Sequence, residues 1–251
     1  MRLFGGNIFT TLQNRMSAVI AAVGASALVC LCGALMTFVL APQQALKAYR
    51  VSRLPLMDAP YVASAAPDSE ILVTGYLQGS QAAPDLQDFI AYSKDRWEVS
   101  LSQEGQGTES APSGSWRHEE TVVPTLTLDM DGTPVTIHSS SYASLGGNLH
   151  ETIIDGTGSL QARDGERLLR DGALRYRGFY NGDQVTVFGT KDTNGTIIPA
   201  DIFAGDRASY ETYQKQAAGF LFFGGIAMLV CSPVVLVLGV LGAMFGRRRG
   251  L

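Results

Sequence analysis

The stretch "MSAVIAAVGASALVCLCGALMTFVLAPQQAL" (residues 16–46) contains no Asp, Glu, Lys or Arg, and neither does "QAAGFLFFGGIAMLVCSPVVLVLGVLGAMFG" (residues 216–246). Each stretch is 31 residues long. About 20 apolar residues are enough for a helix to cross the hydrocarbon of a bilayer. The sequence therefore predicts two transmembrane helices, over residues 17–41 and 217–245.

A cleaved signal peptide is the alternative interpretation of the first stretch, because Arg2 and Arg15 precede it and "FVLA" (residues 38–41) offers a cleavage site. However, its apolar core extends over residues 18–41, whereas signal peptides have apolar cores of about 7 to 15 residues. Pro42 would also follow the cleaved bond directly. We therefore expect the first stretch to stay attached as an anchor.

The basic residues near the two predicted spans set the expected orientation. Arg2 and Arg15 precede the first span, and three arginines, residues 247–249, follow the second. The positive-inside rule then places residues 1–16 and the basic tail, residues 246–251, in the cytoplasm, and residues 47–215 on the far side of the membrane.

The predicted extracytoplasmic segment is acidic. It holds 14 of the Lys and Arg residues and all 23 Asp and Glu residues, which gives a net charge of −9. Such a segment is repelled by nucleic acid, so we expect no nucleic acid partner. The expected partners are the lipid bilayer, which the two spans would cross, and a protein partner or a second copy of the chain.

All three cysteines, Cys30, Cys32 and Cys231, fall within the predicted spans. The segment between the spans therefore has neither a disulfide framework nor a cysteine-based zinc site. It must be stabilised by a hydrophobic core, and about 150 residues are enough to bury one.

The segment over residues 70–206 has the pattern of a β-rich domain. "ILVTGYL" (residues 71–77) and "DFIAYSKDRWEVSL" (residues 88–101) predict strands, because apolar, aromatic and β-branched residues dominate them. Dipeptides that accept positive φ mark the tight turns: Asp131-Gly132 within a predicted hairpin over residues 121–139, and Asn181-Gly182 and Asn194-Gly195 joining three further strands.

Two segments of this domain are predicted to be other than strand. "QEGQGTESAPSGS" (residues 103–115) is rich in Gly and Ser and predicts a mobile loop. "DGERLLRDG" (residues 164–172) predicts a short helix with Leu168 and Leu169 inward. About seven strands and one small helix favour a mainly β fold, a small barrel that is OB-like in its C-terminal strands.

The connections to the membrane are predicted to be helical. Residues 42–69 begin with helix formers and, from Pro55 on, become a linker rich in Ala, Pro and Ser. Residues 207–216 predict a juxtamembrane helix that continues into the second span, where Pro233 is expected to introduce a kink.

The order of these segments resembles the GIDE family, the membrane-anchored E3 ubiquitin ligases of the Mulan type and the bacterial proteins that share their domain. The residues that carry the resemblance are "ILVTGYL", "FIAYSKDRWEV", "VPTLTLDMDGTPVTI" and, above all, "ERLLRDGALRYRGFYNGDQVTVFG" (residues 166–189), lying between two spans. The resemblance covers roughly residues 70–240. It implies a GIDE-like domain that acts as an interaction module beside the membrane, here at the bacterial inner membrane.

The ligases of this family carry a zinc-binding RING domain after the second span. A RING needs about eight Cys or His ligands, whereas "RRRGL" follows the second span in this sequence. We therefore expect no ubiquitin ligase activity from this chain.

The histidines give no motif with metal-ligand spacing. His118-Glu119 begins like an HExxH motif, but Val122 stands where the second histidine is required. His118, His138 and His150 could converge as a histidine-only site, yet His118 and His138 fall near opposite ends of a predicted hairpin. We therefore predict surface histidines, no metal site and no cofactor.

Other candidate motifs have turn or loop interpretations. "DMDGT" (residues 129–133) and "DTNGT" (residues 192–196) lack the distant Glu of a calcium loop and are typical of hairpin turns. "HSSSYAS" (residues 138–144) predicts a polar loop, and no GxSxG motif is present. The sequence thus predicts no catalytic residue, although Ser, His and Asp side chains could still meet in space.

The predicted spans contain small residues four positions apart: Ala18, Ala22 and Ser26, Ala21 and Ala25, and Gly242 and Gly246. This spacing favours close helix packing, although Gly and Ala are also common in membrane helices generally. Neither span contains an ionisable acidic or basic side chain, which argues against an ion or proton pathway.

The function expected from the sequence is a non-catalytic, membrane-anchored interaction or assembly module. The alternative is an extracytoplasmic hydrolase or lipid-modifying enzyme. A deep pocket in which a histidine meets a carboxylate would favour the enzyme. A shallow surface with exposed apolar side chains would favour binding.

Overall fold

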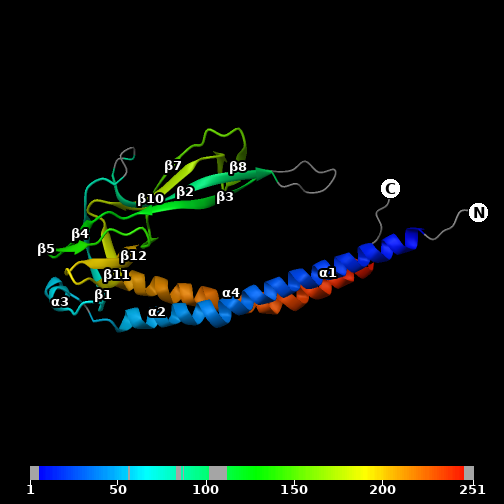
Figure 1. The fold of residues 1–251 in the computed structure, drawn as a ribbon, viewed down its shortest axis with the longest axis horizontal. Coiled ribbons are helices and arrows are strands. Elements are labelled where there is room, and N and C mark those ends of the chain that lie inside the picture. The colour runs from blue at the N-terminus through cyan, green and yellow to red at the C-terminus, as the bar shows by residue number, and fades with distance from the viewer. Residues whose placement is uncertain (1–5, 56, 83–85, 87, 102–111, 246–251) are drawn as a thin grey trace, which may run out of the picture. The chain divides into compact units, whose positions relative to one another are not determined.

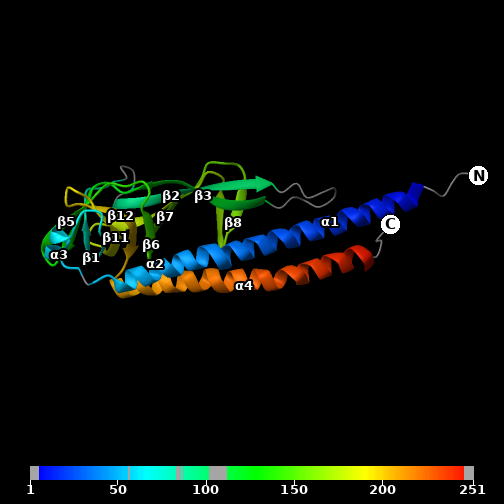
Figure 2. The same ribbon diagram turned by 60° about the horizontal axis from the view of Figure 1, so that its bottom comes forward.

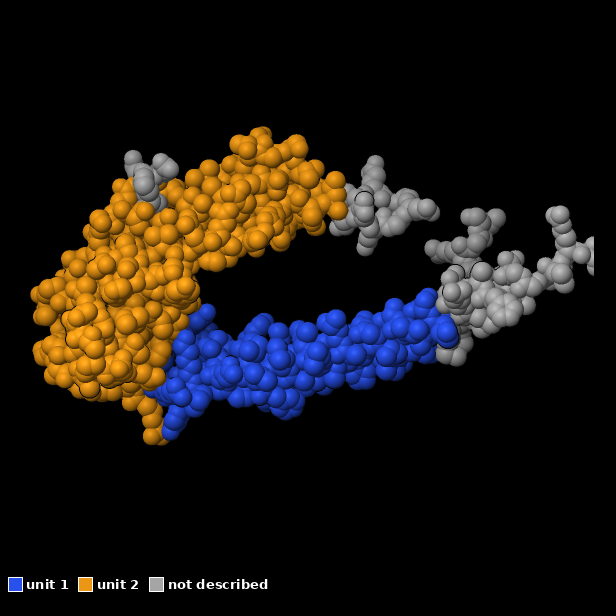
Figure 3. All heavy atoms as spheres, in the orientation of Figure 1, with its two compact units in different colours: residues 1–52, 211–251 blue, residues 53–210 orange. Residues whose placement is uncertain are grey.

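The structure, a computed structural model, describes residues 6–55, 57–82, 86, 88–101 and 112–245. The chain divides into two compact units (Figure 3). The first, here called the helical unit, comprises residues 1–52 and 211–251, and the second, here called the β unit, comprises residues 53–210.

The two charge-free stretches are helical, as predicted. The first lies in α1 (Gly6–Leu35), the π-helical η1 (Met36–Leu40) and α2 (Ala41–Arg53), which follow one another without a break. The second, as far as its described residues 216–245, lies in α4 (Arg207–Phe245). Within the helical unit the two helical segments run side by side (Figures 1 and 2). Both are long and apolar enough to cross a membrane, with mean hydropathy of 2.4 and 2.5.

The π-helical turn has a cause in the sequence. Pro42 has no backbone N–H, so it cannot donate to the carbonyl of Phe38 four residues earlier. The backbone widens there, and the N–H of Ala41 bonds to the carbonyl of Met36. The helix therefore continues past Pro42 to Arg53, which confirms the predicted helical extension. α4 likewise runs through Pro233, and the kink expected there stays a prediction.

Small and hydroxylated residues line the contact between the two helical segments. The hydroxyl of Ser26 donates to the carbonyl of Ser232 at 2.9 Å, and the hydroxyl of Ser232 donates to the carbonyl of Ser26 at 2.8 Å. A Cβ on Gly33 would lie 2.9 Å from the carbonyl oxygen of Gly225. Close approach of the backbones therefore depends on small residues, as the spacing at Ala22 and Ser26 predicts. Gly242, another residue of the predicted spacing, makes no such contact, because a Cβ there would have no heavy atom within 4 Å.

The β unit contains twelve strands in its described residues and one short helix. The helix α3 (Ala59–Ser64) lies in the segment predicted to be a linker, and it forms there because the side chain of Asp58 accepts from the N–H of Tyr61 at its N-terminus. The strands are β1 (Glu70–Gln78), β2 (Phe89–Leu101), β3 (Pro112–Val122), β4 (Leu126–Met130), β5 (Thr133–Ile137), β6 (Ser144–Gly147), β7 (His150–Ile154), β8 (Gln161–Asp164), β9 (Arg167–Arg170), β10 (Leu174–Tyr180), β11 (Gln184–Lys191) and β12 (Ile197–Ala204).

The largest sheet has the order β11-β1-β4-β5-β12-β6, and β11 also pairs with β12. The pairings of β1, β4, β5, β12 and β11 therefore return to the strand from which they start. Within this cycle, β5 and β12 are parallel and the other neighbours are antiparallel. The main hydrophobic core is drawn largely from these strands, including Ile71, Leu128 and Val187.

The other two sheets have the order β3-β2-β10-β7 and β8-β9. Their side chains form a second, smaller core. It consists of Trp97, Ala162, Leu169 and Ala173, with Val99, Trp116 and Ile153 packed against it.

The prediction of a short helix over residues 164–172 was wrong. The segment forms the β8–β9 hairpin, in which Gly165 adopts a φ of +60° at the turn. Leu169 is buried, whereas Leu168 is 59% exposed. Neighbouring residues in a strand point to opposite faces, so only one leucine of the pair can enter the core.

The three strands predicted around Asn181-Gly182 and Asn194-Gly195 are present as β10, β11 and β12. β11 and β12 form the predicted hairpin, but β10 and β11 do not pair, because β10 lies between β2 and β7 in another sheet. The N–H of Gly182 bonds instead to the carbonyl of Leu77 at the end of β1. A turn dipeptide fixes the local backbone but not the partner strand.

The hairpin at Asp131-Gly132 is confirmed as β4–β5, with φ of 52° and 84° at these residues. The loop predicted over residues 103–115 is wrong at its C-terminal end, because β3 begins at Pro112. A Cβ on Gly114 would lie 2.2 Å from the ring of Trp97. The absence of a side chain at Gly114 on β3 therefore leaves room for the Trp97 ring of β2. Residues 103–111 of the predicted loop lie outside the described residues.

Candidate functional site

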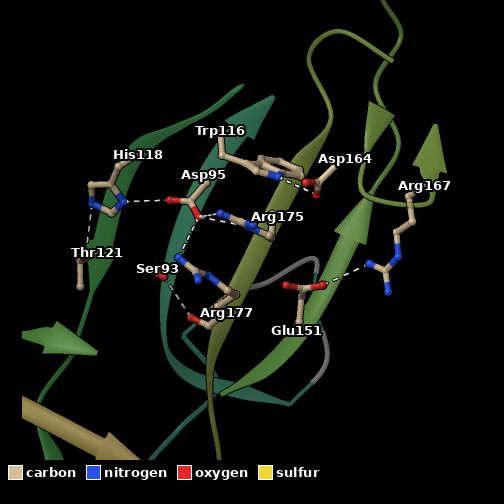
Figure 4. Close-up of polar contacts among 10 residues, drawn as sticks. All are labelled: Ser93, Asp95, Trp116, His118, Thr121, Glu151, Asp164, Arg167, Arg175 and Arg177. Atoms are coloured by element: carbon tan, nitrogen blue, oxygen red, sulfur yellow. Dashed lines mark hydrogen bonds and ion pairs between the residues drawn. The ribbon is translucent and has the colours of Figure 1, made fainter. Parts of the chain in front are cut away.

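A cluster of polar residues in the β unit surrounds Asp95 on β2 (Figure 4). Asp95 is paired with His118 on β3 and with Arg175 on β10, so it lies between these two residues on one face of the sheet. We call Asp95, His118, Thr121, Arg175 and Arg177 the Asp95 cluster.

The carboxylate of Asp95 is only 6% exposed and is saturated with hydrogen bonds. Arg175 donates to Oδ2 from Nε at 3.2 Å and from Nη2 at 2.9 Å, and Arg177 donates to the same oxygen from Nη2 at 3.2 Å. His118 contacts the other oxygen, Oδ1, through Nδ1 at 3.1 Å. A buried carboxylate requires such partners, because an unpaired charge in the interior is very costly.

These contacts change the pKa of Asp95. Burial alone would raise the pKa, since it disfavours the charged form. Hydrogen bonds from Arg175 and His118, together with the charges of Arg177 and Arg175, outweigh burial and hold the pKa of Asp95 below its usual value of 3.8. Asp95 is therefore ionised at neutral pH.

His118 connects Asp95 to a hydroxyl. Since an ionised carboxylate can only accept, His118 donates from Nδ1, and in that tautomer of the uncharged ring Nε2 is an acceptor. The hydroxyl of Thr121 lies 3.3 Å from Nε2. Carboxylate, imidazole and hydroxyl therefore follow one another in the order of an acid–base–nucleophile triad.

A β-bulge creates this alignment. Lys94 pairs with Glu120, but Asp95 pairs with His118, so Glu119 is an extra residue in β3. Without the extra residue, the register would place Glu119 opposite Asp95. The bulge leaves the side chain of Glu119 in contact with Lys94, at 3.0 Å, and with Arg96. Hydrogen bonds from Arg96 and Lys94 lower the pKa of Glu119.

The Asp95 cluster is linked to the β8–β9 hairpin through a tryptophan. The guanidinium carbon of Arg175 lies 4.3 Å from the ring centroid of Trp116, a cation–π distance. The indole N–H of Trp116 donates to Asp164 at the end of β8, at 2.9 Å. These contacts join β2, β3, β10 and β8, so the cluster stabilises this part of the β unit.

The electrostatics of the Asp95 cluster limit its capacity for acid–base chemistry. A triad carboxylate stabilises the imidazolium that forms during the reaction, but the single charge of Asp95 is already shared by two guanidiniums. His118 is also 55% exposed, so water competes at its ring. The cluster can order a histidine and a hydroxyl, but the carboxylate that would stabilise an imidazolium already accepts from Arg175 and Arg177.

Two cavities of the β unit lie elsewhere. A cavity of about 360 Å³ is lined by Met57, Asp58, Ala59, Pro60, Leu72, Thr74, Met130, Asp131, Thr133 and Arg207. A more open one of about 430 Å³ is lined by Gly79, Gln81, Asp88, Ile90, Tyr180 and Asn181. The Asp95 cluster borders neither cavity.

The histidines considered in the sequence lie apart. His138 follows β5 and contacts the carbonyl of Ser139 at 2.9 Å. His150 on β7 stacks on Tyr180, with 4.0 Å between ring centroids, and lies 3.2 Å from Asp183. The residues that the structure describes contain no group of three or more His, Cys, Asp or Glu side chains that could hold a metal ion.

The other candidate segments have turn and loop geometry. Asp129 accepts from the N–H of Gly132 at 2.8 Å, and Asp192 accepts from the N–H of Thr193 at 2.7 Å. In the predicted polar loop, Ser140 accepts from the N–H of Ala143 at 3.1 Å. The acidic residues of both Asp-containing motifs thus hold the backbone, as the turn interpretation predicts.

Sequence reasoning missed Asp95, Arg175 and Arg177. A signal was available, because the alternation in β2 places Asp95 on the same face as Trp97, which is buried. A charged residue at an inward position indicates a partner on a neighbouring strand. The partner itself could not be found, since the β2–β10 pairing joins segments 80 residues apart.

Comparison of the chain with protein-family models, with curated proteins and with solved structures gives no match.

Proposed function

We propose that this protein is a non-catalytic, membrane-anchored interaction module that presents an acidic β domain beside the outer face of a membrane. The observation that carries the proposal is that the histidine–carboxylate pairs at His118 and His150 border neither of the two cavities described above. An enzyme of the hydrolase class needs its acid–base groups where a substrate can bind.

The proposed architecture is an OB-like barrel carried by two membrane helices. It is supported by the cyclic pairing of β1, β4, β5, β12 and β11 and by the parallel pairing of β5 with β12. Closure of a small sheet removes exposed strand edges, which would otherwise recruit other chains. In this proposal, the strands inserted between β1 and β4 and between β5 and β11 form the four-stranded sheet and most of the second core.

The proposed location is a bacterial inner membrane, with residues 47–215 outside the cytoplasm. The charge distribution supports it, because basic residues flank the two helical spans at the chain ends and the acidic residues lie between the spans. The resemblance of residues 70–240 to the GIDE family supports an interaction role for the domain in the same position.

Cross-linking in the intact membrane tests the interaction role. A photoreactive amino acid is introduced at Tyr142, whose side chain is 96% exposed, and the cells are irradiated before solubilisation. The proposal predicts a discrete cross-linked species, either with another protein or with a second copy. As a control, the same amino acid replaces the buried Phe179, which is 0% exposed. Recovery of the bare monomer alone from the chain with the photoreactive amino acid at Tyr142 would contradict the interaction role.

A second candidate function, an extracytoplasmic hydrolase, is favoured by one observation, the order Asp95, His118, Thr121. In this case, Thr121 would be the nucleophile and His118 the general base. A fluorophosphonate probe on the full chain tests it. Labelling that is lost in Thr121→Val and in His118→Gln, but kept in Thr127→Val, would support the hydrolase. Absence of labelling in the unaltered protein would leave the interaction module as the better candidate.

A further inference from the structure

The cavity of about 360 Å³ in the β unit has an apolar wall and a polar rim. We call it the Leu72 cavity. Leu72 is 2% exposed and lies on the face of β1 opposite to Ile71 and Val73, which enter the main core. Met57 and Met130 continue the apolar wall. Its volume is in the range of cavities that accept small ligands or single side chains.

The hydroxyl of Thr74 can accept a hydrogen bond from a ligand in this cavity but cannot donate one. Thr186, its cross-strand neighbour, donates its hydroxyl hydrogen to the carbonyl of Gly205 at 2.9 Å. The two threonine hydroxyls are 2.9 Å apart. Since a hydroxyl carries one hydrogen, Thr74 must donate to Thr186, and the remaining lone pair of Thr74 can only accept.

Two carboxylates add further acceptors. Asp58 uses Oδ1 to accept from the N–H of Tyr61. The side chain of Asp131, in the β4–β5 turn, has no hydrogen bond or ion pair to any residue within the described ranges. An ionised carboxylate offers about four acceptor positions. The polar rim therefore offers many acceptors to a ligand.

Arg207 is the single basic residue among those that line the cavity. It donates from Nη1 to the carbonyl of Pro55 at 3.0 Å and from Nη2 to the carbonyl of Leu54 at 2.6 Å. Each of these two nitrogens therefore uses a hydrogen on a backbone carbonyl, and with Asp58 and Asp131 the lining keeps a formal charge of −1. The two carboxylates outnumber the single guanidinium, so the net charge of the lining disfavours an anionic ligand.

We propose that the Leu72 cavity binds the side chain of a lysine or arginine from a partner protein. The aliphatic stem lies along Leu72, Met57 and Met130, and the cationic head faces Asp58, Asp131 and Thr74. Lys and Arg combine an apolar stem with a head that only donates, which matches an apolar wall and an acceptor-rich rim. This inference rests on the proposed function, because it assigns the chemistry by which the interaction module recognises its partner.

Methionine methyl resonances give a direct measure of binding. The chain has seven methionines, so the full-length protein labelled with ¹³C at the methionine methyl groups gives a simple spectrum in detergent micelles. Met57→Leu and Met130→Leu identify the two relevant signals. The probe is Nα-acetyl-lysine N-methylamide, and saturable shifts of both signals are expected. Nε-acetylation of the probe removes the charge and should abolish the shifts.

Two matched variants separate the cavity from the general acidity of the domain. Asp131→Asn removes a rim charge but keeps the turn, since Asn also adopts positive φ readily. It should weaken binding of the lysine probe about threefold or more. Asp68→Asn also removes a charge from an exposed aspartate of positive φ, 62° against 52° for Asp131, but Asp68 lies outside the cavity lining. The Asp68→Asn variant should bind the lysine probe with the same affinity as the unaltered protein.

Several outcomes would overturn the inference. These are the absence of saturable shifts at Met57 and Met130, equal shifts with the Nε-acetylated probe, and equal weakening by Asp131→Asn and Asp68→Asn. Binding of spermidine without binding of the lysine probe would assign the site to a free polyamine instead of a protein side chain. If cross-linking in the membrane still yields a partner while the lysine probe fails, the cavity assignment is wrong and the interaction module stands.

Discussion

Asp95 on β2 accepts hydrogen bonds from both Nε and Nη2 of Arg175 on β10, and both bonds end on the same carboxylate oxygen. β2 and β10 are the two central strands of the four-stranded sheet. The pair therefore joins strands whose register places Trp97 and Ala173 in the second core. Charge-assisted bonds of this kind are stronger and more directional than neutral ones.

Replacement of Asp95 should destabilise this sheet strongly. Asp95→Asn leaves the guanidiniums of Arg175 and Arg177 without a countercharge, and breaking a buried ion pair costs about 3–5 kcal/mol. The expected fall in the melting temperature is roughly 5–15 °C for a domain of this size. The two tryptophans, Trp97 and Trp116, are the only ones in the chain, so their fluorescence reports unfolding of this region.

Glu98→Gln on the same strand is the matched control for Asp95→Asn. Glu98 bonds to Arg117 at 3.1 Å, but their side chains are 49% and 72% exposed. Exposed pairs contribute about 0–1 kcal/mol, so the melting temperature should change little. Equal effects of the two substitutions would show that burial of Asp95 does not determine its contribution.

The lowered pKa of Asp95 predicts a dependence of stability on pH. A carboxyl whose pKa is lower in the folded state stabilises the protein fully above its unfolded pKa, about 3.9, and this contribution is lost as pH falls through the folded pKa. The melting temperature of the unaltered protein should therefore fall more steeply below about pH 4 than that of Asp95→Asn. Parallel curves for the two proteins between pH 2.5 and pH 7 would refute the coupling.

Local signals in the sequence predict the strands and their turns, because residues near in sequence determine them. Asp131-Gly132 and Asn194-Gly195 each mark a hairpin that the structure contains. The prediction of a short helix at Leu168 was wrong because the local pattern fits two structures. A pair of adjacent leucines fits one face of a helix, but the positive φ of Gly165 and the alternating burial of Leu168 and Leu169 belong to a hairpin.

The partners of the strands could not be predicted in the same way. Asn181-Gly182 forms a tight turn as expected, yet β10 and β11 join different sheets. The Asp95 cluster depends on such long-range pairing and on the bulge at Glu119. An inward charge at Asp95 indicates that a partner exists, but only the tertiary fold brings His118, Arg175 and Arg177 to it.

Cysteine labelling tests the proposed orientation. In a chain with Cys30, Cys32 and Cys231 replaced by serine, Tyr142→Cys gives one highly exposed thiol in the β unit. A membrane-impermeant maleimide should label it in intact bacterial cells, because the basic flanks of both spans favour the cytoplasm. Gly250→Cys, in the basic tail, should be labelled only after permeabilisation. The reverse pattern of labelling would invert the topology and remove the proposed role outside the membrane.

Packing of the two long apolar helices should depend on Gly225 and not on its neighbour Gly224. A Cβ at Gly225 would lie 2.2 Å from the hydroxyl of Thr37 and 2.9 Å from the carbonyl oxygen of Gly33, whereas a Cβ at Gly224 would have no heavy atom within 4 Å. Gly225→Ala should therefore push the helices apart, at a cost of about 1–3 kcal/mol. Gly224→Ala should leave them in contact.

Oxidative cross-linking measures that contact directly. The hydroxyl oxygens of Ser26 and Ser232 are 2.9 Å apart, so cysteines at both positions, in a chain otherwise free of cysteine, should form an intramolecular disulfide. Gly225→Ala should slow this reaction severalfold, and Gly224→Ala should not. Equal rates in the two variants would mean that the helices do not approach through the small residues. In that case the reciprocal serine bonds could not hold the spans together, because a hydrogen bond requires its heavy atoms within about 3.2 Å.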